Sequence, residues 1–141
     1  MSLTLDVAQK IVAVALERRR ARGMKPLTIA VLDAGGHLIA LAREDGTSTL
    51  RPEIAQGKAN GAIAMGLGSR ALFKRAQEQP FFIQAMNELA GGSLVPVPGG
   101  VLIRDDTGII GAVGITGDTS DNDEACAITA IKAAGLRADG G

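Results

Sequence analysis

The chain has 141 residues, and its 15 Lys and Arg residues balance its 15 Asp and Glu residues, so that its formal net charge is zero. This neutral charge, with no Trp, no Tyr and three Phe residues, excludes a typical nucleic-acid-binding protein, which needs a basic surface and aromatic side chains for base stacking. No apolar run reaches the roughly 20 residues of a membrane span, and a single cysteine excludes a disulfide framework. Because the first residues also lack the pattern of a signal peptide, we expect a cytoplasmic protein without nucleic-acid or membrane partners.

The expected elements alternate between helices and β-hairpins. In chain order they are a helix over 5–22, a hairpin of strands 27–32 and 37–43, a helix over 51–67, one or two helical pieces within 70–90, a hairpin of strands 101–104 and 109–116, and a helix over about 122–136. Thr4 is expected to cap the first helix and Gly23 to end it. Because hairpins pair antiparallel, this order predicts an α+β fold: a single domain over residues 1–141 with an antiparallel sheet flanked by helices.

Four acidic residues precede the last helix: Asp118, Asp121, Asp123 and Glu124. Their oxygens could bind a divalent cation, but the spacing of Asp121 and Glu124 favours helix capping. One histidine and one cysteine cannot form a His/Cys metal cage, so no metal site is predicted. Cys126, between two alanines of that helix, is expected to be buried.

The sequence Pro98-Gly99-Gly100 is the first candidate for a binding site. A proline followed by two glycines can present successive backbone N–H groups to an anion. It can equally form an ordinary turn into the next strand. The sequence alone does not decide between an anion site and an ordinary turn.

Charged residues elsewhere complete the candidate site. The cations that could share an anion site with the glycines are Arg43, Arg51 and Lys58. Lys58 lies among Ala and Gly residues of a predicted helix, where it either points into a pocket or reaches solvent. His37 follows the Gly-Gly turn of the first hairpin, and we expect it near the loop that contains Arg43 and Asp45. A lone histidine is often structural or simply exposed, and this position keeps a functional role open.

Several stretches together resemble the GlcG/HbpS family of small haem-binding or "haem-degrading" domains, which also form the C-terminal domain of PduO-type proteins. The stretches that carry the resemblance are VLDAGGHLIA at 31–40, REDG at 43–46, IAQGKA at 54–59, PGG at 98–100, and IGAVGITG at 110–117 followed by DNDE at 121–124. They cover nearly the whole chain in order. The resemblance implies a profilin-like α+β fold, assembly into dimers or larger homo-oligomers, and haem or a related tetrapyrrole as the ligand. It also implies an iron-side contact from a threonine in a K-A-x-T-A helix segment, where this chain has Gly61 and therefore no hydroxyl.

Three hypotheses about function follow. In the first, the chain binds haem, with His37 as the axial ligand and Arg43 and Lys58 on a cationic rim. In the second, it is an enzyme for a small carboxylate-bearing metabolite. The Gly99 and Gly100 amides and Arg43 or Arg51 would hold the carboxylate, with Lys58, His37 or Asp45 as acid or base. In the third, it is a non-catalytic subunit of a homo-oligomer. The first two require the glycines, Lys58 and His37 to share one cavity.

Overall fold

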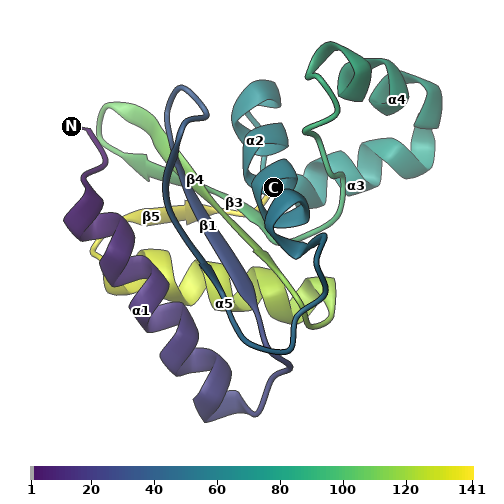
Figure 1. The fold of residues 1–141 in the computed structure, drawn as a ribbon. Helices are drawn as coiled ribbons and strands as arrows, with labels where there is room; N and C mark the ends of the chain where they lie inside the picture. Colours follow the sequence, from purple (N-terminus) through teal and green to yellow (C-terminus); the bar gives the residue numbers. More distant parts are fainter. Residues whose placement is uncertain (1) are drawn as a thin grey trace.

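The computed structural model describes residues 2–141, and Figure 1 shows its helices and strands around one sheet. The helices are α1 (Leu5–Arg22), α2 (Arg51–Met65), α3 (Ser69–Glu78), α4 (Pro80–Leu89) and α5 (Ser120–Ala133). The strands are β1 (Thr28–Asp33), β2 (Leu38–Arg43), β3 (Gly100–Asp105), β4 (Gly108–Thr116) and β5 (Arg137–Asp139). This order confirms the predicted helices and both hairpins, and it differs from the prediction near the C-terminus.

The sheet joins the two hairpins through β1 and β4. Its strand order is β2-β1-β4-β3-β5, and each strand pairs antiparallel with its neighbours. Along the β1–β4 pair, Thr28 lies opposite Thr116 and Asp33 lies opposite Gly111. The predicted α+β fold with an antiparallel sheet flanked by helices is therefore confirmed.

Helices cover both faces of this sheet (Figure 1). α1 and α5 lie together on one face, over the main hydrophobic core that includes Ile11, Ile29 and Ile131. α2 lies on the other face, against a smaller core that includes Leu32 and Leu102. α3 and α4 project beyond α2 and enclose a third apolar cluster of their own. The central strands are covered on both faces, so a functional group can reach solvent only at the ends of the sheet or along its edges.

Two glycines allow α2 to lie directly on the sheet. Gly100 of β3 and Gly114 of β4 are paired opposite each other. A side chain at position 100 would collide with the carbonyl oxygen of Lys58, and one at position 114 with that of Ala55. The backbone of α2 therefore approaches the strands closely, which is a contact that only glycine permits.

The C-terminal part of the chain corrects two predictions. The last helix spans Ser120–Ala133 rather than about 122–136, and Thr119 is its N-cap rather than Asp121. The Thr119 hydroxyl accepts a hydrogen bond from the N–H of Asn122 at 3.2 Å. Residues 137–139 then form the edge strand β5 beside β3, which the sequence did not predict because three residues are too few to show an alternating pattern.

The acidic residues just before α5 and in its first turns already have protein partners. Asp118 accepts hydrogen bonds from two backbone N–H groups and from the Asn122 amide. Asp121 and Glu124 both form ion pairs with Arg70 at the start of α3. Within residues 2–141, no group of three or more His, Cys, Asp or Glu side chains is arranged to hold a metal ion.

Candidate functional site

Lys58 lies in the interface between α2 and the sheet. Its side chain is 2% exposed, and its Nζ donates a hydrogen bond to the carbonyl oxygen of Ile115 at 2.9 Å. The same Nζ lies 3.4 Å from Oδ2 of Asp123, which is itself buried. The other carboxylate oxygen of Asp123 accepts the backbone N–H of Asp118 at 3.0 Å. The buried pair thus ties α2 to the first turn of α5 on the opposite face of the sheet.

Burial governs the charge of this pair. Desolvation lowers the pKa of Lys58 against the attraction of Asp123, and the nearby guanidinium of Arg51 lowers that pKa further. Desolvation also raises the pKa of Asp123, against the attraction of Lys58. Arg51 donates from Nη1 to the Thr116 hydroxyl at 2.7 Å. Because Lys58 and Asp123 are buried and their polar atoms are bonded to protein groups, a substrate could reach Lys58 only if α2 moved away from the sheet.

Gly99 and Gly100 lie beside Lys58, and both glycines and Pro98 are buried. The N–H of Gly100 donates to Oγ of Ser69 at 2.7 Å. Gly99 has a φ of +124°, and a Cβ at this position would lie 2.8 Å from Nζ of Lys58. The two glycines therefore fit a crowded turn into β3, and Ser69 uses one of the amides that could have bound an anion.

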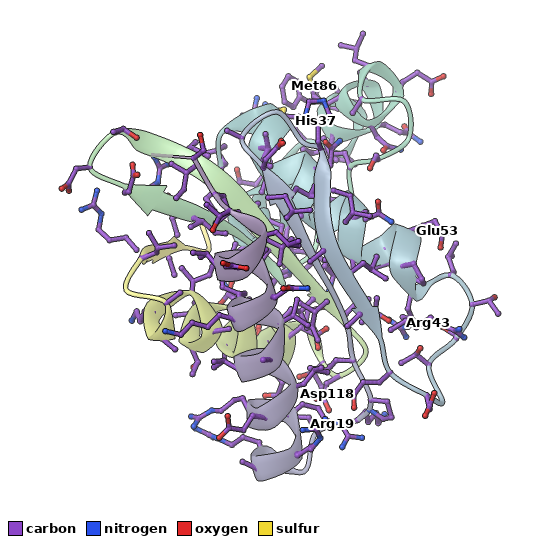
Figure 2. The ribbon with its side chains drawn as sticks, turned by 60° about the vertical axis from the view of Figure 1, so that its left-hand side comes forward. Arg19, His37, Arg43, Glu53, Met86 and Asp118 are labelled. Carbon is purple, nitrogen blue, oxygen red and sulfur yellow. The ribbon has the colours of Figure 1, made fainter. Side chains whose placement is uncertain are left out.

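Arg43 and Asp45 line a different, open hollow of about 460 Å³ between β2 and the C-terminal half of α1. Figure 2 shows His37 and Arg43 at opposite ends of β2. The expected proximity of His37 to the loop around Asp45 is therefore not found. The hairpin turn holds His37 at one end of the sheet, while Arg43, paired with Thr28, lies at the other.

His37 is held at the β1–β2 turn by Asp33. Its side chain is 82% exposed, and its Nδ1 lies 3.2 Å from Oδ1 of Asp33. The same oxygen accepts the backbone N–H groups of Gly35 at 2.9 Å and His37 at 3.0 Å. These hydrogen bonds and the nearby imidazole lower the pKa of Asp33, so the carboxylate stays ionised at neutral pH.

A hollow of about 440 Å³ adjoins His37. The β1–β2 turn, the β3–β4 turn and the N-terminal residues 2–3 line it together. Its apolar lining comes from Leu3, Ile109 and Ile110. This volume falls within the usual range of about 300–1,000 Å³ for small-molecule sites. Ser2, Asp33 and Thr107 add polar groups to the lining, so the hollow is only partly apolar. An exposed imidazole beside this hollow is the arrangement in the structure that most resembles a ligand site.

The hollow at His37 and the surroundings of Lys58 are separate. Asp33, which holds His37, pairs with Gly111, whereas Lys58 reaches Ile115. Four residues along β4 correspond to about 14 Å at roughly 3.4 Å per residue. The structure therefore brings Lys58 together with the glycines and Arg51, but not with His37.

The helix segment that lacks the family threonine is covered by the chain itself. Leu94 is buried against α2, and a Cβ at Gly61 would lie 3.0 Å from its Cγ. One turn earlier, a Cβ at Gly57 would lie 2.6 Å from Cγ2 of Val95. The segment between α4 and β3 thus occupies the surface beside position 61, which offers neither a hydroxyl nor room for a flat ligand.

Asp33 is absent from the site residues predicted by sequence. Its position in the turn, two residues before Gly35, is typical of an Asx turn, in which an Asp side chain accepts nearby backbone N–H groups. That spacing would have identified Asp33 as a residue whose side chain stabilises the turn. The contact with the His37 imidazole depends on the folded turn and has no signal in the sequence.

In the described part of the chain, none of the helices combines the length and the apolar composition that a membrane crossing requires.

Comparison with known proteins agrees with the resemblance. The profile of a family described as "Haem degrading protein HbpS-like" matches residues 3–132. Protein GlcG of Escherichia coli strain K12 is 33% identical over 114 residues, which cover 81% of this chain and 81% of GlcG.

Solved structures show the same fold. The crystal structure of a PduOC:heme complex has a TM-score of 0.86 and 26% sequence identity, covering 96% of this chain and 97% of that chain. A crystal structure of HbpS has a TM-score of 0.80 and 25% identity, covering 94% of this chain and 89% of that chain.

Proposed function

Because the chain belongs to the HbpS-like family, we propose that it binds haem or a related tetrapyrrole through the imidazole of His37. The observation that carries this proposal is the contact between Nδ1 of His37 and the ionised Asp33 at 3.2 Å, on a side chain that is 82% exposed. Among residues 2–141, His37 is the single histidine and therefore the single imidazole available to iron.

The contact with Asp33 favours the tautomer of His37 whose Nε2 can bind a metal. A carboxylate at Nδ1 favours the proton on that nitrogen and leaves the lone pair on Nε2. Histidine ligands of metals usually have such a partner, which fixes the ring and raises its basicity. In the exposed side chain of His37, Nε2 is the nitrogen that a ligand would meet.

The hollow beside His37 suits an apolar ring system. Ile109 supplies half-buried apolar surface, with the buried side chains of Leu3 and Ile110 behind it. The volume of about 440 Å³ accepts a ligand that is partly exposed to solvent. When bound, haem supplies an iron centre capable of electron transfer and oxygen chemistry. Gly61 and Lys58 have no part in this proposal, because Leu94 covers the first and the second is enclosed below α2.

We also propose that the protein works as a homo-oligomer. β2 is an edge strand of the sheet, and Leu38 at its start is 49% exposed next to His37. Unpaired edge strands favour association with another chain, and an exposed leucine adds apolar area to such a contact. A second copy on this edge would lie next to His37, which precedes the first residue of β2. Analytical ultracentrifugation tests this part: a dimer or larger species supports it, and a strict monomer at all concentrations contradicts it.

Haemin titration followed by the Soret band tests the central proposal. We expect the wild type to saturate at a defined stoichiometry with a shifted Soret maximum. His37→Ala should lose this shift, while Arg43→Gln, at the other end of β2, should keep it. Far-UV circular dichroism of each variant verifies that it is folded. A titration without a defined end point, or a Soret shift that survives in His37→Ala, would overturn the proposal.

A further inference from the structure

A third hollow lies at the C-terminal end of α1, away from His37. It has a volume of about 200 Å³ and is formed between the last turns of α1 and the first turns of α5, which share one face of the sheet in Figure 1. The residues that line it from α1 and its C-terminal turn are Arg18, Arg22 and Met24. α1 has 18 residues and is therefore about 27 Å long, so this hollow and the one near Leu3 are separate sites.

Two guanidinium groups flank this hollow without partners. Arg18 and Arg22 are one helical turn apart on α1, and Arg18 is half-buried. Neither guanidinium group forms a hydrogen bond or ion pair with any residue from 2 to 141. Most other arginines of the chain have a partner, for example Arg70 with Glu124 and Arg104 with Asp139. A pair of free guanidiniums on one hollow is therefore unusual within this molecule.

The chemistry of the lining favours a carboxylate with a short apolar body. Guanidinium groups bind carboxylates through paired, charge-assisted hydrogen bonds. The apolar part of the lining, called the floor below, consists of Met24, Cys126 and the exposed Ala125. Asn122 and Thr129 add an amide and a hydroxyl. Burial raises the pKa of the Cys126 thiol to about 11, so the floor carries no negative charge at neutral pH. A volume of about 200 Å³ limits the ligand to a few heavy atoms.

We propose that Arg18 and Arg22 bind the carboxylate of a small organic acid whose hydrocarbon part rests on Met24, Ala125 and Cys126. This site is independent of the haem proposal, because none of its residues lines the hollow at His37. The apolar floor distinguishes such a ligand from a simple inorganic anion.

Isothermal titration calorimetry with sodium butyrate, sodium acetate and sodium phosphate tests the proposal. We expect one butyrate per chain, with weaker binding of acetate and of phosphate, because only butyrate can cover the apolar floor. Arg18→Gln and Arg22→Gln should each weaken butyrate binding at least tenfold. Arg20→Gln is the matched control, since it removes the same charge from the same helix without lining this hollow.

A second variant tests the hollow without changing any charge. Ala125→Leu fills the floor, and it should weaken butyrate binding while the protein stays folded by circular dichroism. The proposal is overturned if the wild type does not bind butyrate, if the Arg18 and Arg22 variants bind it as tightly as the wild type, or if phosphate binds as tightly as butyrate.

Discussion

Two pairs of a basic residue with an aspartate have opposite environments in this protein. His37 and Asp33 lie in an exposed turn, with the imidazole 82% exposed. Lys58 and Asp123 lie between α2, the sheet and α5, with both side chains almost fully buried. The first pair leaves a nitrogen for an external ligand, and the second has its polar atoms committed to protein partners. The sequence suggested a ligand role for both His37 and Lys58. In the structure His37 is exposed and can meet a ligand, whereas Lys58 is buried and cannot.

Removing one partner of the buried pair should have the largest effect. Lys58→Met leaves the Asp123 carboxylate without its cation, and breaking a buried ion pair in this way costs about 3–5 kcal/mol of the free energy of unfolding. Urea unfolding followed by circular dichroism measures the loss. Lys58→Met/Asp123→Asn removes both charges and should recover at least half of it. A loss below about 1 kcal/mol in the single variant would show that the pair does not stabilise the fold.

Restoring the family threonine should destabilise the protein without improving haem binding. In Gly61→Thr the new side chain would meet Leu94, whose Cγ lies 3.0 Å from the position that the new Cβ would take. Overpacking of this kind costs about 1–3 kcal/mol. Leu94→Ala removes the Cγ atom, so Gly61→Thr should cost less stability in the Leu94→Ala background than in the wild type. A gain in haemin affinity in Gly61→Thr would instead indicate a binding site on α2.

Weakening the exposed pair should reduce affinity and leave stability nearly unchanged. Asp33→Asn removes the negative charge beside Nδ1 of His37, and loss of such a partner typically costs about 10–100-fold in metal affinity. Haemin titration measures this loss, with Asp45→Asn as a control on an exposed aspartate outside the hollow. Equal affinities of the two variants would contradict the role given to Asp33.

The buried pair should also make the free energy of unfolding depend on pH. Burial lowers the pKa of Lys58 below 10.5, so between these two values the unfolded chain binds more protons and the free energy of unfolding rises with pH. Burial raises the pKa of Asp123 above 3.8, so between those values the native state binds more protons and the free energy of unfolding falls as pH rises. The difference between the wild type and Lys58→Met/Asp123→Asn isolates both effects. A difference that is constant with pH would contradict them.

The sequence predicted the fold better than the site, for physical reasons. Thr4, Gly23 and the alternating strands act through neighbouring residues, so local patterns predict them. The partners of Lys58 and Gly61 come from Ile115, Asp123 and Leu94, which are more than 30 residues away in the chain. No local pattern contains such contacts. Because Asp123 is so far from Lys58 in the sequence, the small residues around Lys58 suggested a pocket. The structure has a buried ion pair there instead.

The most direct test of the central claim is a crystal structure of the protein with haemin. We predict iron bonded to Nε2 of His37, with Nδ1 still against Asp33 and the ring system over Ile109 and Ile110. Iron bonded to any other side chain, or haemin bound away from the β1–β2 turn, would contradict the claim.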